Sequence, residues 1–305
     1  KALDKASSKL GDKVDALAAL PSRRPANRQK RQLQQKKKFE AERFKREQKR
    51  AMNAFQAQFS KELAKNVKPQ IQKLNSDLAS SSTSTDVVAA LDSSGLMNAP
   101  TQGLNLMGPD TARSIGQAYS DICSKFPFLA GNIGRANCSR LGSSTYGQCS
   151  MSRGAIDFNT KYYGRGNEAS FAASFSNCIS TQFHPQGVMS KGAAYAVASH
   201  ELGHAIEGRL EKLMKAAGVD TTEKRKKRYF ISGRVKDKVL SNLSLVDDRS
   251  VIKAELSEYA VMDSAEFFAE AVSEYLCSRS PRPVAAEVGK ILERFLKNDF
   301  SDLGI

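Results

Sequence analysis

The stretch "ASHELGHAIE", residues 198–207, contains two of the three histidines in the chain, and a glutamate directly follows the first of them. If this stretch is helical, His200 and His204 stand one turn apart on the same face, so both imidazoles can reach one point. Zinc binds imidazole nitrogen at about 2.0–2.1 Å. Glu201 lies about 100° further around the helix, where it can act on a water without being a ligand. The pattern His-Glu-x-x-His is typical of the zinc-binding helix of metallopeptidases, in which the glutamate is the general base.

A catalytic zinc needs three protein ligands and one open position, and two sources of the third ligand are open. One is His184, the remaining histidine. The other is the segment "MDSAEFFAEAVSEYL" (262–276), which carries Glu266, Glu270 and Glu274 at successive steps of four among apolar residues. Buried carboxylates need a partner, and a metal with its histidines is a suitable one. Glu266 is alternatively a capping residue that answers Asp263, and we expect Glu274 on an exposed helix face.

Several motifs resemble known families. "HELGH" with the later "YAVMDSAEFFAEAVSEY" resembles the catalytic region of anthrax lethal factor and related zincin domains of the gluzincin type. "FHPQG" (183–187), "SDICSKFPFLAGNI" and "AIDFNTKYYG" are similar to zincin-like domains in minor head, portal-associated proteins of tailed bacteriophages. The resemblance covers about residues 115–280 and leaves out the N-terminal region.

The lethal factor resemblance assigns a role to each matching position. It implies that His200, His204 and Glu266 hold Zn²⁺ and that Glu201 is the catalytic base. Substrate preference does not transfer, because a basic insertion, "TTEKRKKRYFISGRVKDK" (221–238), separates the two metal-bearing segments.

Three further residues are candidates around this centre. The resemblance implies that the Tyr259 hydroxyl assists at the developing oxyanion and that Glu270 orients a metal ligand. Tyr259 is alternatively an ordinary packed tyrosine, and Glu270 an exposed helical residue. His184 has no counterpart in lethal factor, and we expect it to line the substrate cleft or to contact a loop.

The sequence therefore favours a zinc-dependent endopeptidase that acts on a protein or peptide substrate. The phage resemblance implies a virion-associated minor head protein that meets head and portal proteins, in the phage virion or the host cytoplasm. One alternative is a toxin or effector protease, similar to lethal factor, that is delivered into a target cell. Another is a structural head protein with a non-catalytic zincin fold.

The basic charge is concentrated near the N-terminus. The chain has 305 residues and a net charge of +15. Residues 1–80 hold 21 Lys and Arg against 8 Asp and Glu, a net charge of +13. We expect a basic helical or coiled-coil arm over 1–80, with one long helix from Arg28 to Leu78 whose apolar stripe packs on a partner helix. Residues 23–50 are either a solvated charged face or a non-specific, salt-sensitive contact to DNA.

Composition divides the rest of the chain. Residues 81–110 are rich in Ser, Thr, Gly and Pro and are predicted to be a linker. Residues 111–305 are predicted to be an α+β zincin-like domain, in which a small mixed sheet packs on the metal-binding helix. The segments 154–159 and 170–180 are the expected strands.

The five cysteines form no C-x-x-C pair, which argues against a disulfide framework and a thiolate zinc site. We expect free thiols, with a Cys138–Cys149 bridge as the open alternative. The sequence has no apolar run long enough for a membrane span and no signal-peptide pattern in its first thirty residues, so no membrane contact is expected.

Overall fold

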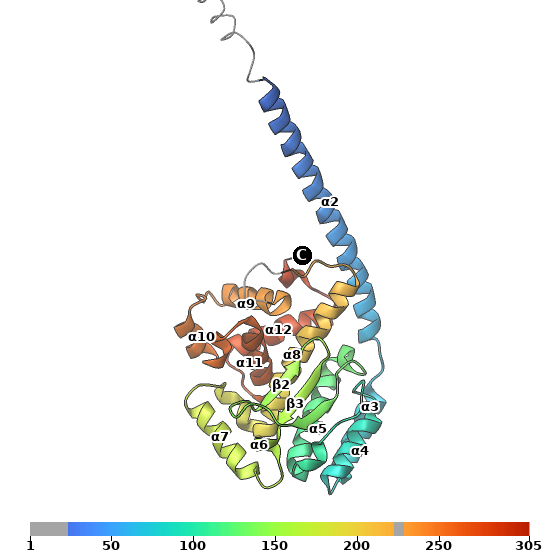
Figure 1. The fold of residues 1–305 in the computed structure, drawn as a ribbon, viewed down its shortest axis with the longest axis vertical. Coiled ribbons are helices and arrows are strands. Elements are labelled where there is room, and N and C mark those ends of the chain that lie inside the picture. The colour runs from blue at the N-terminus through green and yellow to red at the C-terminus, as the bar shows by residue number, and fades with distance from the viewer. Residues whose placement is uncertain (1–23, 223–228, 305) are drawn as a thin grey trace, which may run out of the picture. The chain divides into compact units, whose positions relative to one another are not determined.

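The computed structural model describes residues 24–222 and 229–304 (Figure 1). The chain divides into two units between Arg50 and Ala51. Helix α2 (Arg24–Leu63) begins in the first unit, and all other described elements belong to the second. Residues 1–23 of the predicted arm and residues 223–228 of the basic insertion lie outside the described residues.

The predicted arm boundary at residue 80 is wrong, because residues after Arg50 belong to the core of the larger unit. Phe55 and Phe59 are fully buried, and the Phe55 ring meets that of Phe300 edge-on at 4.7 Å. The apolar stripe that we expected to pack on a partner helix is therefore covered within the chain itself.

The single long helix predicted up to Leu78 is also interrupted. Helix α2 ends at Leu63, and α3 (Lys68–Ser80) begins with a proline in its first turn. Pro69 lacks a backbone N–H and its ring clashes with the carbonyl four residues earlier in a helix interior, so a continuous helix is broken ahead of it, whereas the first turn of a new helix tolerates it.

The segment predicted as a linker, residues 81–110, is folded. Helix α4 (Ser84–Ser94) begins with a capping box, in which the Thr83 side chain and the Asp86 side chain each bind the other's backbone N–H. Val87 and Leu91 are fully buried on its inner face. The Ser and Thr content that suggested a linker thus serves to start a helix.

The sheet has three strands in the order β1-β3-β2. β3 (Ala155–Asn159) is central, parallel to β1 (Ala136–Ser139) and antiparallel to β2 (Gly147–Ser150). The predicted α+β class and small mixed sheet agree with this arrangement. Because β3 separates the strands that carry Cys138 and Cys149, about 9–10 Å lies between the two outer strands, too far for a disulfide. All five cysteines are free, as predicted.

The second predicted strand, residues 170–180, is instead the helix α7 (Glu168–Ser180). Its buried residues are Phe171 and Phe175, which stand four positions apart on one helix face.

The His-Glu-x-x-His motif lies on α8 (Ala193–Ala216), which packs against α11 (Ser264–Cys277), α5 (Pro109–Lys125) and β2 (Figure 1). No helix among the described residues is long and apolar enough to cross a membrane. The remaining helices are α6 (Thr160–Tyr163), α9 (Phe230–Asn242), α10 (Arg249–Glu255) and α12 (Pro283–Leu296), and the short 3-10 segments are η1 (Leu104–Leu106), η2 (Pro127–Leu129), η3 (Gln186–Lys191), η4 (Tyr259–Val261) and η5 (Ser301–Leu303).

Candidate metal centre

The close crossing of α8 and α11 brings the two segments that carry the candidate ligands together. A Cβ atom on Gly203 would lie 3.0 Å from the Ala269 Cα atom, so the two backbones approach more closely than most side chains permit. Glu266 and Glu270 flank Ala269 on α11, and His200 and His204 flank Gly203 on α8. The glycine inside the His-Glu-x-x-His pattern therefore has a structural reason, since it lets the carboxylates reach the imidazoles.

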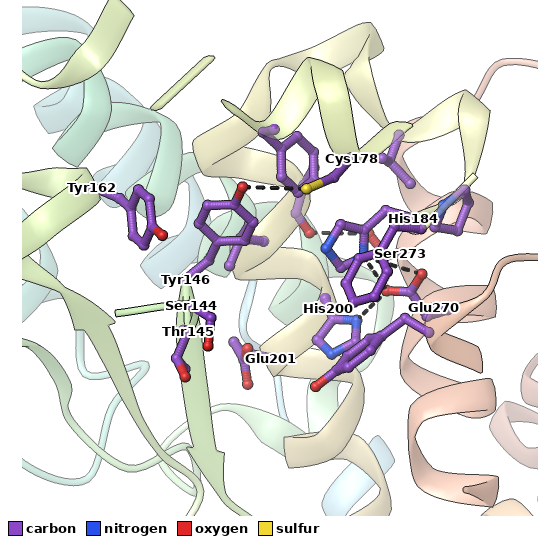
Figure 2. Close-up of a pocket in the computed structure, with 18 of the residues that line it drawn as sticks. Ser144, Thr145, Tyr146, Tyr162, Cys178, His184, His200, Glu201, Glu270 and Ser273 are labelled. Carbon is purple, nitrogen blue, oxygen red and sulfur yellow. Dashed lines mark hydrogen bonds and ion pairs between the residues drawn. The ribbon is translucent and has the colours of Figure 1, made fainter. Parts of the chain in front are cut away.

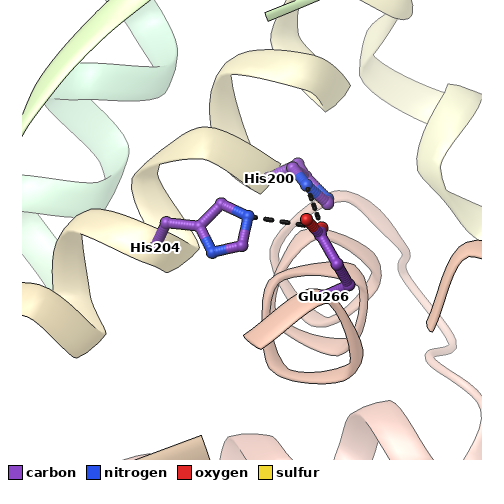
Figure 3. Close-up of side chains that lie close together, drawn as sticks. All are labelled: His200, His204 and Glu266. Atoms are coloured by element: carbon purple, nitrogen blue, oxygen red, sulfur yellow. Dashed lines mark ion pairs between the residues drawn. The ribbon is translucent and has the colours of Figure 1, made fainter. Parts of the chain in front are cut away.

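Three side chains converge on one point (Figure 3). The Glu266 Oε2 atom lies 3.2 Å from His200 Nε2 and 3.4 Å from His204 Nε2. One ligand atom from each residue lies within 4.8 Å of the others. Two ligands of a tetrahedral zinc ion, each at about 2.0–2.2 Å from it, stand about 3.3 Å apart, so the observed spacing suits such an ion.

The contacts of Glu266 also fit a metal ligand better than a simple ion pair. Its Oε2 atom is buried and has no partner with hydrogen-bond geometry, although both imidazoles are near. Burial alone would raise the pKa of Glu266, but His200 and His204 lower it below its usual value, so the group is a carboxylate at neutral pH. Asp263 caps the helix by accepting the backbone N–H groups of Ala265 and Glu266, but the Glu266 carboxylate lies beside His200 and His204 and, among the described residues, makes no return bond to the Asp263 backbone, so the reciprocal capping role is not formed.

Glu201 lies beside this point and beneath strand β2. It is 5% exposed, and burial raises its pKa above the ordinary value. The nearby Cys149 backbone on β2 partly offsets this rise in the pKa. Gly147 on the same strand leaves room for the carboxylate, because a Cβ atom there would lie 3.0 Å from Glu201 Oε1. A buried carboxylate with a raised pKa is suited to accept and return a proton.

Tyr259 closes another side of the centre. Its hydroxyl donates to Glu266 Oε1 at 3.4 Å, and its ring centroid lies 5.8 Å from that of His200. Burial, followed by the nearby carboxylates, raises the pKa of Tyr259 far above its ordinary value, so the hydroxyl keeps its proton at neutral pH. It can therefore act as a hydrogen-bond donor.

Glu270 lies between His200 and His184 (Figure 2). Its Oε1 atom lies 2.8 Å from His200 Nδ1 and 3.1 Å from His184 Nδ1, while Ser257 Oγ donates to Oε2 at 2.8 Å. Burial alone would raise the pKa of Glu270, but the two histidines lower it to about 2. Ser257 was not predicted, and no local pattern marks it, because its role arises only where η4 meets α11.

Two cavities meet at His200, Glu201 and Tyr259. The larger, of about 550 Å³, is lined by residues of α7, of α8 and of the segments that precede β2 and α8, among them Tyr146, Phe175 and Phe183. The smaller, of about 380 Å³, contains His204, Glu266 and the outer edge of β2. The candidate ligands, base and tyrosine thus lie in an accessible cleft rather than in a closed core.

All seven predicted site residues lie at or beside this centre. Glu274, the other carboxylate that we considered, does not: it is 1% exposed and forms an ion pair with Arg282 Nη2 at 2.8 Å. The expectation of an exposed face for Glu274 is wrong, because Arg282, at the start of α12, folds back over it.

Replacing Glu270 with glutamine should weaken zinc binding by about 10–100-fold, because a partner that orients a metal-binding histidine typically contributes that much. Titration of the metal-free protein with zinc against a competing chelator measures the change. Glu274→Gln is the matched control, since this carboxylate lies one turn further along α11 and binds Arg282 instead. It should lower stability and leave zinc affinity unchanged. Equal zinc affinity in Glu270→Gln and the unsubstituted protein would contradict the assigned role.

Comparisons of the chain with protein-family models, curated proteins and solved structures found no match. The case for a function therefore depends on the site itself and on the motif resemblance.

Proposed function

We propose that this chain is a zinc-dependent endopeptidase with a zincin-like catalytic domain. The observation that carries the proposal is the convergence of His200, His204 and Glu266 on one point beside a buried carboxylate, Glu201. A zinc ion at that point would act as a Lewis acid that lowers the pKa of a water and polarises a peptide carbonyl.

Each residue around the point then has a defined task. Glu201 takes a proton from the attacking water and passes it to the leaving amine. The Tyr259 hydroxyl donates to the oxyanion that develops on the carbonyl. Glu270 holds the His200 ring so that its Nε2 atom stays aimed at the metal position.

An exposed sheet edge supports a peptide as the substrate. β2 lies at the edge of the sheet, pairs only with β3 among the described strands, and lines the cleft through Gly147, Gln148 and Cys149. An extended peptide can add to such an edge through main-chain hydrogen bonds, which would bring its carbonyl groups past Glu201.

The test is cleavage of a peptide library by the zinc-loaded protein. We expect internal peptide bonds to be cut, activity to disappear on chelation, and zinc to restore it. A protein that binds zinc at this site and cuts nothing would favour the non-catalytic head-protein alternative.

The resemblance to phage minor head proteins adds a proposed setting, in the virion or the host cytoplasm, with head and portal proteins as neighbours. The lethal factor resemblance supports the alternative of an effector protease. The two differ in genomic context: capsid and portal genes beside this gene favour the first, and secretion or immunity genes favour the second.

The basic segment, residues 23–50, is proposed to contact DNA. Thirteen Lys and Arg lie within residues 23–50, against three Glu. The three glutamates form exposed ion pairs with Lys36, Arg43 and Arg46, and such pairs contribute little to stability. Since the basic residues outnumber the glutamates, most of the positive charge of the segment is available to bind DNA phosphates.

Replacing Lys36, Lys37 and Lys38 with glutamine should therefore weaken non-specific binding to duplex DNA. Glutamine has a similar helix propensity, so α2 should persist. The slope of log affinity against log salt should decrease by up to about 2.7, which is about 0.9 for each phosphate that a lysine no longer neutralises. Fluorescence anisotropy at several salt concentrations measures it. An unchanged slope, or no DNA binding by the unsubstituted protein, would contradict the DNA contact.

A further inference from the structure

His184 lies in the wall of the larger cavity, between α7 and η3. Its ring stacks on Phe175, with ring centroids 5.2 Å apart, and meets Tyr259 edge-on at 5.5 Å. The segment is fixed to the centre by the backbone, since Tyr259 N donates to Phe183 O at 3.1 Å. The ring is 9% exposed, so it is held in one orientation.

Glu270 orients the His184 ring, because the His184 Nδ1 atom lies 3.1 Å from Glu270 Oε1. A carboxylate only accepts hydrogen bonds, so the neutral His184 ring carries its proton on Nδ1 and keeps a lone pair on Nε2. For His184, no described residue hydrogen-bonds to Nε2, and the ring lines the cavity. With one ring face on Phe175 and Nδ1 on Glu270, the Nε2 edge is what remains to face the cavity.

Three hydroxyl groups of the wall are already paired. The Tyr146 hydroxyl bonds to Ser174 Oγ at 2.7 Å, and the Thr181 and Ser273 hydroxyls donate to backbone carbonyls. Ser144 and Thr145 are further polar residues of the wall, and its apolar part includes Phe175, Phe183, Val188 and Val197. An apolar occupant without a donor would displace water from the His184 Nε2 atom and leave it unpaired, which lowers the affinity for that occupant by about 5–150-fold.

We propose that His184 is a specificity-determining residue, whose Nε2 atom selects a substrate side chain that is aromatic and carries a hydrogen-bond donor, as tyrosine does. This inference rests on the proposed peptidase function for the claim that the occupant belongs to a peptide. Sites built around a hydrogen bond discriminate strongly against an analogue that lacks it.

Equilibrium binding to the full-length, zinc-loaded Glu201→Gln protein tests this, because binding is then read without turnover. The probes are three blocked tripeptides that are identical except for the central residue, which is tyrosine, O-methyltyrosine or phenylalanine. Their binding is measured by NMR line broadening. Tyrosine should bind about 5–150-fold more tightly than the other two. O-methyltyrosine keeps the ring and the oxygen and loses only the donor. Equal affinities would overturn the inference, whatever any variant shows.

His184→Asn in the same background separates the two ring nitrogens. The asparagine amide can still donate toward Glu270, as Nδ1 does, but offers nothing at the position of Nε2. Tyrosine should then lose its advantage over phenylalanine, while one zinc per chain stays bound. A tyrosine preference that persists in His184→Asn, or an equal loss of affinity for all three probes, would overturn the assignment.

Failure of the peptidase proposal is a separate result. Cleavage by the unsubstituted protein without any tyrosine preference sinks only the role of His184, whereas a tyrosine preference without cleavage sinks only the peptidase.

Discussion

Replacing Glu201 with glutamine should leave one zinc bound per chain and lower peptide cleavage by about 10²–10⁴-fold, the usual contribution of a general base. Glutamine has nearly the same shape, so it fits beneath Gly147 and still meets the Cys149 backbone. It cannot accept the proton of the attacking water. Because burial already raises the pKa of Glu201, removal of its charge should not destabilise the fold.

The measurement is the rate of cleavage beside the zinc content of the same sample. Glu255→Gln is the matched control, since Glu255 on α10 lines neither cavity, and it should cleave at the unsubstituted rate. Full activity in Glu201→Gln would mean that another group is the base and that the proposed mechanism is wrong.

Replacing His204 with alanine should abolish stoichiometric zinc binding. His204 and His200 are the two proposed nitrogen ligands, and the loss of one would leave a two-ligand site that is open to water. Zinc affinity should decrease more than in Glu270→Gln, because His204→Ala removes a proposed ligand, whereas Glu270→Gln removes only the carboxylate that orients His200. Bound zinc stabilises the folded state in proportion to the logarithm of its excess over the dissociation constant, so zinc should no longer raise the melting temperature of His204→Ala.

Metal analysis after dialysis and thermal melts with and without zinc provide both readouts. His184→Asn is the matched control, as it changes the only histidine not assigned as a ligand, and it should keep its zinc. One tightly bound zinc in His204→Ala would place the metal elsewhere in the chain.

The local part of the site could be predicted from the sequence. His200, Glu201 and His204 depend only on helical periodicity, and the structure indeed places them on one helix. Glu266 could not be chosen from spacing alone, because its proximity depends on how α11 crosses α8. The motif resemblance selected it over Glu270 and Glu274.

The wrong predictions about the fold share a physical cause, which is that composition does not reveal tertiary contacts. "SFAASFSNCIS" alternates apolar and small residues in a way that suits a strand, yet the spacing of Phe171 and Phe175 suits a helix face, and burial of both rings decides for the helix. The Ser and Thr residues of 81–110 suggested a linker, but Thr83 is a helix cap and Leu91 belongs to the core. The contacts of His184 could likewise not be predicted from the spacing of residues, because α7, η4 and α11 come together only in the fold.

The most direct measurement is anomalous diffraction at the zinc absorption edge from crystals of the zinc-loaded protein. The account predicts one strong peak per chain, at about 2.0–2.2 Å from His200 Nε2, His204 Nε2 and a Glu266 carboxylate oxygen, with one coordination position open beside Glu201. A peak held by other residues, or no peak between these three side chains at saturating zinc, would contradict the account.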